Sequence, residues 1–171
     1  HEATEGRQPS LRTLVCDDHV LVRGGLVALL QDLPDVEVIG QAGDGDELVS
    51  LAAKLRPDLI ITDVSMRRMS GLDAMVLVRQ SLPECKVLVL SMHDNVEFVR
   101  EALAAGAAGY LLKDSAMVEL ELALDAIRAG EVYLSPRVSS QLVAQLRLPV
   151  AASQSPVQES PLTPRQLEIL T

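Results

Sequence analysis

Aromatic residues and cysteines are scarce in this chain of 171 residues. It has no Trp, one Phe and two Tyr, so its core must consist of aliphatic side chains and Met. The two cysteines, Cys16 and Cys85, lie within apolar segments and lack the spacing of metal ligands. This pattern favours reduced, buried thiols over a disulfide framework and leads us to expect a cytoplasmic protein.

The chain also lacks long apolar runs and has few basic residues. No run approaches the roughly 20 residues that cross a bilayer, so we expect no membrane partner. Residues 1–10 lack the pattern of a signal peptide and are interpreted as a leader without function. Acidic residues number 24 against 15 Lys and Arg, for a net charge of -9. Because nucleic-acid affinity depends on basic side chains that neutralise phosphates, this balance argues against DNA binding by this chain and favours cations as ligands.

Short β-branched runs alternate with longer amphipathic segments along the first 130 residues. Five runs predict strands, namely RTLVCD, VEVIGQAG, DLIITD, KVLVLS and GYLLK. Between them, Asp44 with Glu47 and Asp94 with Glu97 have the spacing of capping boxes at helix starts. The first helix is the weakest prediction, because it would contain glycines at 24–25. The alternation predicts an α/β fold, a doubly wound, five-stranded parallel sheet with helices on both faces.

The pattern changes after Gly130. An amphipathic segment is followed by a stretch rich in Pro, Ser and Gln, which predicts a helix and a flexible linker. The closing letters LTPRQLEILT place Thr, Pro and Gln as at the start of a new helix. We therefore expect four parts: a leader at 1–10, a domain at 11–130, a helix and linker at 131–161, and the start of a second domain at 162–171.

Polar side chains end four of the predicted strands. Asp17 and Asp18 follow the first strand and Asp63 ends the third. Ser91 ends the fourth strand and Lys113 follows the fifth. In an open parallel sheet, ligands bind beyond the carboxyl ends of the strands, and the flavodoxin-like order 2-1-3-4-5 makes strands 1 and 3 the walls of that crevice. We therefore expect these side chains to meet at one place.

The adjacent carboxylates of Asp17 and Asp18 require a cation nearby. A few Å apart, they repel each other by about 1 to 4 kcal/mol at effective dielectric constants of about 80 to 20. Mg²⁺, which prefers a few hard oxygen ligands, suits this place. A carboxylate nucleophile, a metal and donors for phosphoryl oxygens together form a centre for phosphoryl transfer. Asp63 stands alone on its strand and is the predicted nucleophile, and the adjacent pair is predicted to hold the metal.

Four stretches resemble the successive signatures of a two-component response-regulator receiver domain. They are DDH, DLIITDVSM, LSMHD and GAAGYLLKDS, and the resemblance covers about residues 11–130. LTPRQLEIL resembles the entry to a LuxR-type helix-turn-helix, which points to the NarL/FixJ class of transcriptional regulators. The resemblance implies a phosphorylation-switched signalling module, not an enzyme in the ordinary sense.

The resemblance also implies a role for each acidic residue. Asp63 would accept a phosphoryl group from a sensor histidine kinase. Asp18 would bind Mg²⁺ directly and Asp17 through water. The main-chain carbonyl of Ser65 would complete the protein ligands of the metal.

Three further residues would read and transmit the phosphoryl group. By the same resemblance, Ser91 would donate its hydroxyl to it, Lys113 would pair with it, and Tyr110 would rotate as Ser91 moves. Phosphorylation would then release a C-terminal DNA-binding domain, promote a homodimer, or both. Contact with DNA is expected only through that domain, beyond these 171 residues.

Two positions depart from the family pattern, and two other functions compete with the leading one. Gln166 replaces the usual Glu, and Arg67 replaces the usual Pro. Arg67 is the best support for a degenerate receiver that binds without phosphorylation, but the intact acidic residues, Ser91 and Lys113 argue against that alternative. A Mg²⁺-dependent phosphohydrolase of the haloacid-dehalogenase kind also uses an Asp nucleophile, but its D-x-D spacing is missing here. Taken singly, each polar strand-end residue could be an ordinary solvated side chain. His19 is interpreted as a residue at a helix start, not as a ligand.

Overall fold

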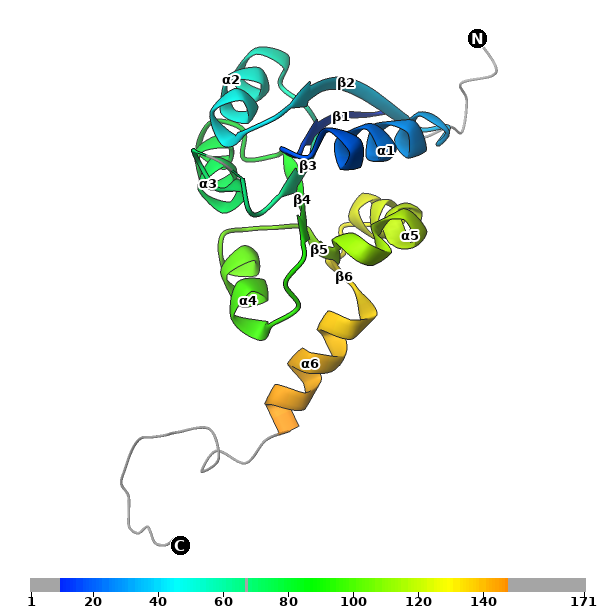
Figure 1. The fold of residues 1–171 in the computed structure, drawn as a ribbon, viewed down its shortest axis with the longest axis vertical. Coiled ribbons are helices and arrows are strands. Elements are labelled where there is room, and N and C mark those ends of the chain that lie inside the picture. Colours follow the sequence, from blue (N-terminus) through cyan, green and yellow to red (C-terminus); the bar gives the residue numbers. More distant parts are fainter. Residues whose placement is uncertain (1–9, 67, 148–171) are drawn as a thin grey trace, which may run out of the picture. The chain divides into compact units, whose positions relative to one another are not determined.

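A computed structural model describes residues 10–66 and 68–147. Its contacts divide the chain into two units, residues 1–138 and 139–171. The first unit holds a six-stranded, all-parallel sheet in the order β2-β1-β3-β4-β5-β6 (Figure 1). The strands are β1 (Leu11–Cys16), β2 (Val36–Ala42), β3 (Leu59–Asp63), β4 (Lys86–Ser91), β5 (Gly109–Leu112) and β6 (Tyr133–Leu134).

Helices cover both faces of the sheet. In Figure 1, α1 and α5 lie on one side and α2, α3 and α4 on the other. The helices are α1 (Val20–Gln31), α2 (Gly45–Leu55), α3 (Gly71–Ser81), α4 (Val96–Ala104), α5 (Ala116–Arg128) and α6 (Pro136–Arg147), with a 3₁₀ turn η2 (Lys113–Ser115) before α5. None of the helices in the described ranges is long and apolar enough to cross a membrane.

The core is aliphatic, as the scarcity of aromatic residues predicts. Leu26 and Leu30 of α1 and Leu120 and Leu124 of α5 pack with strand residues in one buried cluster. The central strand β3 is buried at all five positions. Strands buried on both faces read as continuous apolar runs, because neither side meets water.

The predicted fold class and strand order 2-1-3-4-5 are confirmed, and a sixth strand extends the sheet. β6 pairs with β5 through Gly109 with Tyr133 and Tyr110 with Leu134. Two residues are too few to show a period, so no pattern in the sequence predicted this strand. The glycines at 24–25 lie within α1.

One of the two predicted helix caps is correct and the other is wrong. Glu47 N–H donates to Asp44 Oδ1 at 2.9 Å, as expected at the start of α2. At α4 the cap is Asn95 in place of Asp94, because Phe98 N–H donates to Asn95 Oδ1 at 3.0 Å.

Several predictions fall on residues that the structure does not describe. The leader lies almost entirely among them, as do Arg67, most of the linker and the predicted start of a second domain at 162–171. The helix expected within 131–161 corresponds to α6.

Candidate functional site

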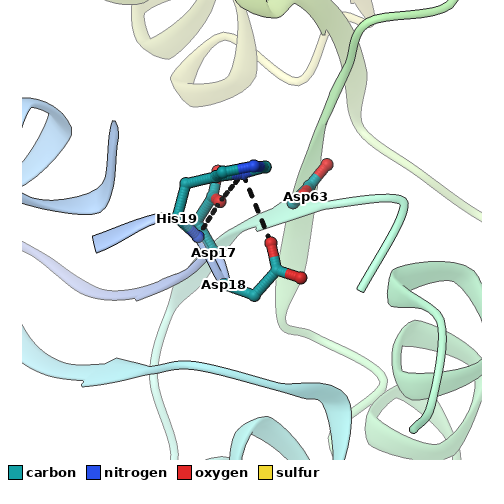
Figure 2. A group of neighbouring side chains, drawn as sticks. All are labelled: Asp17, Asp18, His19 and Asp63. Atoms are coloured by element: carbon teal, nitrogen blue, oxygen red, sulfur yellow. Dashed lines mark hydrogen bonds and ion pairs between the residues drawn. The ribbon is translucent and has the colours of Figure 1, made fainter. Parts of the chain in front are cut away.

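Three acidic residues meet at the carboxyl ends of β1 and β3. Asp17 and Asp18 occupy the turn between β1 and α1, and Asp63 is the last residue of β3. With His19, they place one ligand atom each within 4.8 Å of one another (Figure 2). The parallel register of β1 and β3 brings these loops to the same edge of the sheet. The predicted convergence of the carboxylates is therefore present in the structure.

Lys113 connects two of these carboxylates. Its Nζ lies 3.0 Å from Asp17 Oδ2 and 3.1 Å from Asp63 Oδ2, and all three side chains are almost completely buried. Burial alone would lower the pKa of the Lys113 amino group, but hydrogen bonds and charge from both carboxylates outweigh it and raise that pKa. The lysine therefore remains a cation at the centre of the site.

Asp63 experiences a different balance. Burial raises the pKa of its carboxyl most strongly, Lys113 opposes the shift, and the negative charge of Asp17 adds to it. The net shift is upward, so one lysine does not compensate for the buried negative charge. The site is short of positive charge.

The residues present fit a hard divalent cation. Within the described residues, no donor is aligned for a hydrogen bond to the buried oxygens Asp17 Oδ2 and Asp18 Oδ1. Lys113 contacts the first of these as an ion pair, and His19 Nδ1 lies 3.3 Å from the second. Carboxylate oxygens are the hard ligands that Mg²⁺ prefers, and the excess negative charge of this cluster favours a bound cation.

A shallow groove of about 570 Å³ opens beside the acidic cluster. Asp18 lies at one side, and Ser65, Met66 and Phe98 contribute to the rest of its lining. Ser65 N–H donates to Asp63 Oδ1 at 3.3 Å, which places the loop after β3 against the Asp63 carboxyl. The groove leaves the Asp18 side of the acidic cluster open.

The loop after β3 closes tightly onto Asp63 through Gly71. Gly71 N–H donates to the Val64 carbonyl at 2.9 Å. A Cβ atom at Gly71 would lie 2.0 Å from the Asp63 carbonyl oxygen, far inside contact distance. Only glycine permits this approach at the start of α3.

Ser91 and Tyr110 meet at the main chain of one residue, His93. His93 N–H donates to Ser91 Oγ at 2.9 Å, and the Tyr110 hydroxyl donates to the His93 carbonyl at 2.7 Å. Both Ser91 and Tyr110 are buried. Burial raises the pKa of the Tyr110 hydroxyl, and a hydrogen bond with the Ser91 side chain partly opposes that shift. The loop after β4 is thus tied to both residues.

The family model for the response regulator receiver domain matches residues 13–125. The chain belongs to this family. The match makes it a two-component receiver rather than a phosphohydrolase, and its strand order agrees with that assignment.

Named relatives of this receiver are regulators of transcription. It is 35% identical over 165 residues to the transcriptional regulatory protein MctR of Rhizobium johnstonii, which covers 95% of this chain and 72% of MctR. It is 39% identical over 160 residues to the transcriptional regulatory protein LiaR of Bacillus subtilis, covering 94% and 74%. Over 157 residues it is 38% identical to the nitrate/nitrite response regulator NarL of Escherichia coli, covering 92% and 72%.

Solved receivers share the fold. A LuxR-family response regulator from Aurantimonas superposes with a TM-score of 0.77 at 31% identity, covering 80% of this chain and 98% of that one. The receiver domain of a NarL-type regulator from Mycobacterium tuberculosis gives 0.65 at 38% identity, covering 69% and 96%.

Three residues of this receiver site escaped the sequence analysis. His19 is the N-cap residue directly before α1, as interpreted, but its Nδ1 also lies 3.3 Å from both Asp17 Oδ1 and Asp18 Oδ1. Arg23 Nη1 donates to the Asp17 carbonyl at 2.6 Å and holds the acidic turn. His93 contacts Ser91 and Tyr110 through main-chain atoms, and such contacts do not depend on a particular side chain that a sequence pattern could reveal. The position of Arg23, one helical turn after His19, was the only available signal.

Proposed function

We propose that this receiver accepts a phosphoryl group on Asp63 from a sensor histidine kinase and thereby controls an attached DNA-binding domain. The observation that supports this most directly is the position of Asp63 Oδ2, which is 3.1 Å from Lys113 Nζ and beside the Asp17 and Asp18 carboxylates. The names of the relatives support a role in transcription. The proposal needs a C-terminal domain beyond the described residues.

The transfer is a displacement at phosphorus. An oxygen of Asp63 forms a bond to phosphorus, and the bond from phosphorus to an imidazole nitrogen of the kinase breaks, leaving its electron pair on that nitrogen. Lys113 would shift from Asp63 to the phosphoryl oxygens, since it already lies within reach. Bound Mg²⁺ would neutralise negative charge on the carboxylates and the phosphoryl group. In this proposal Asp18 holds the metal directly, Asp17 through water, and Ser65 through its main-chain carbonyl.

Ser91 and Tyr110 are the proposed readers of the phosphoryl group. Ser91 Oγ accepts from His93 N–H, and in this proposal its own proton would turn to a phosphoryl oxygen. Tyr110 contacts the same loop residue through its hydroxyl. A phosphoryl group on Asp63 would therefore be linked to the loop before α4 by two successive contacts, the first to Ser91 and the second from Ser91 to His93. We propose that this loop carries the signal to dimerisation or to release of the DNA-binding domain.

The kinase is proposed to dock on apolar side chains that rim the site. α1 starts directly after the acidic turn, where Val20 and Leu21 are exposed, and α5 starts shortly after Lys113, where Met117 and Val118 are exposed. A phosphohistidine must reach bonding distance of Asp63, so the kinase surface has to cover this rim. Exposed apolar patches next to a reactive group are typical of protein docking sites.

Labelling by acetyl phosphate tests the acceptor assignment. Wild type with Mg²⁺ should gain the mass of one phosphoryl group, and Asp63→Asn should gain none. Asp73→Asn, an acidic residue in the first turn of α3, is the matched control and should label normally. Equal labelling of Asp63→Asn would refute the assigned nucleophile. Failure of wild type to label with Mg²⁺ would support a degenerate receiver.

The division of metal roles needs a separate measurement. Asp18→Ala should weaken Mg²⁺ binding more than Asp17→Ala, because a directly bound ligand contributes more than one that acts through water. Calorimetric titration with Mg²⁺ gives both affinities without any phosphoryl donor. Similar losses in the two variants would contradict the division.

A further inference from the structure

Residues 133–138 form a strap that runs along the free edge of β5. β6, the first part of the strap, pairs with Gly109 and Tyr110. Ser135 N–H then donates to the Tyr110 carbonyl at 3.0 Å. The main chain of the proposed reader Tyr110 is thus held by the strap, while its hydroxyl is held by His93.

Buried hydrogen bonds fix the middle of the strap. Ser135 Oγ accepts from Leu112 N–H at 3.0 Å and donates to Glu119 Oε1 at 2.8 Å. The Tyr133 hydroxyl donates to the same carboxylate oxygen at 3.2 Å. Ser135 is buried, and Leu112 directly precedes Lys113. The strap therefore moves with the end of β5 and the start of α5.

Arg137 links the end of the strap to two loops of the site. Its Nε lies 3.2 Å from Asp94 Oδ2 and its Nη2 lies 3.5 Å from Asp114 Oδ2. Asp94 follows His93, the residue that contacts both Ser91 and Tyr110, and Asp114 follows Lys113. Arg137 lies in the first turn of α6, which runs on to Arg147. One side chain thus joins both phosphoryl-reading loops to the start of the helix that follows the sheet.

We propose that Arg137 couples the acceptor site to the start of α6, so that the ion pairs of Arg137 and an anion at Asp63 stabilise each other. This inference rests on the proposed function. Ser91 Oγ accepts from His93 N–H in the arrangement that Arg137 supports. A Ser91 proton donated to a phosphoryl oxygen makes Oγ a better acceptor, because hydrogen bonds in a chain polarise one another. An anion at Asp63 therefore stabilises the observed conformation of residues 93–94, and that conformation in turn stabilises the bound anion.

The coupling is reciprocal and of modest size. If a phosphoryl group strengthens the Arg137 pairs, those pairs must strengthen binding of the phosphoryl group by the same factor. The three side chains are partly exposed, and such pairs change equilibria only about two- to fivefold. A switch needs no more than this where the two states are close in free energy.

Binding of beryllofluoride, a phosphoryl mimic, tests the coupling at equilibrium. In calorimetric titrations at saturating Mg²⁺, Arg137→Gln should raise the Kd about two- to fivefold. Arg147→Gln removes the same charge at the other end of α6 and should bind like wild type. Asp114→Asn, a second variant of the same cluster, should shift the Kd in the same direction as Arg137→Gln. At about 1 M salt the ratio of variant to wild-type Kd should approach one, because the Debye length falls to about 3 Å.

The outcomes separate this inference from the proposed function. If wild type binds and Arg137→Gln binds equally well or more tightly, Arg137 does not couple the site to α6. A weakening that persists unchanged at high salt would also overturn the inference, since it would come from altered packing. If wild type itself does not bind beryllofluoride, the proposed phospho-acceptor function fails instead.

Discussion

Asp63 shares one lysine, Lys113, with a second buried carboxylate, Asp17, so negative charge exceeds positive charge among these three side chains. The Asp63 side chain is only 4% exposed. Burial and the charge of Asp17 outweigh Lys113, so the pKa of Asp63 lies above its ordinary value. The ionised carboxylate therefore costs folding free energy until a cation binds, which is a reason for the site to bind Mg²⁺.

Neutralising Asp63 should stabilise the fold when metal is absent. Asp63→Asn leaves Lys113 and Asp17 as a balanced pair, so the free energy of unfolding in EDTA at pH 7 should rise by about 1 kcal/mol. The folded pKa is raised, so the cost exists above that pKa and disappears as the pH falls below the unfolded value near 4. Urea unfolding at pH 7 and pH 4 measures both effects.

The control for this substitution is Glu131→Gln, which removes the same charge at an exposed position. It should change stability by less than about 0.5 kcal/mol. A less stable Asp63→Asn protein at pH 7 would show that its pairing with Lys113 outweighs the burial.

The two thiols should be inert in the folded chain. Burial is the main cause that raises the pKa of Cys16 and of Cys85 to about 12 each. At pH 8 about one thiol in 10⁴ is then ionised, so a thiolate-selective reagent such as Ellman's should react only after unfolding. Unfolded thiols ionise near pH 9, so stability should fall as the pH rises from about 9 toward 12. Rapid reaction of two thiols in native buffer would contradict this.

At the scale of elements, the start of α3 requires close approach of Gly71 to the main chain of Asp63, and the Cβ of any other residue would prevent it. Gly71→Ala would place its Cβ 2.0 Å from the Asp63 carbonyl oxygen, so the loop after β3 must move. We expect a loss of about 2 kcal/mol or more in the free energy of unfolding, with weaker labelling at Asp63. Chemical denaturation and the acetyl phosphate assay on the same samples measure the two effects.

Gly24→Ala is the matched control on another helix. Gly24 lies within α1 and no atom would come within 4 Å of its Cβ. Alanine should therefore stabilise the protein by about 0.5 to 1 kcal/mol through its higher helix propensity. If both substitutions had the same effect, close approach at Gly71 would not be what positions the loop.

At the scale of the whole molecule, we expect the rim of exposed apolar side chains to affect phosphoryl transfer from a kinase but not transfer from a small donor. Leu21 is 89% exposed and Val118 is 82% exposed, each at the start of a helix next to the site. A charge at either position, as in Leu21→Glu, should lower kcat/KM for transfer from a sensor histidine kinase about tenfold, a loss of about 1.4 kcal/mol. Labelling by acetyl phosphate should not change, because that donor needs no protein surface.

Leu146→Glu provides the control, since Leu146 is similarly exposed but lies on α6. Phosphotransfer should be followed with a histidine kinase that labels the wild-type chain. If Leu21→Glu and Leu146→Glu accept phosphate from it at the same rate, the rim is not the docking surface.

The sequence was sufficient to predict the acidic site because its residues stand at strand ends. Asp17, Asp63 and Lys113 each follow a continuous apolar run, and parallel strands bring such ends to one edge. The contacts of His93 and the two-residue strand β6 could not be predicted in this way. The first involves main-chain atoms, and the second is too short for a period.

Local patterns determined the α/β fold class and the identity of the charged residues at the strand ends, because periodicity and strand-end chemistry are properties of short segments. The strand order came from the topology rule for open parallel sheets, not from any local pattern. Tertiary structure alone decided which partners those residues have. Lys113 contacts Asp17 and Asp63, and these three residues come from the ends of three different strands. Arg137 contacts Asp94 and Asp114, which belong to two different loops. Pairings between residues so far apart in sequence depend on strand register and loop conformation, which no local pattern encodes.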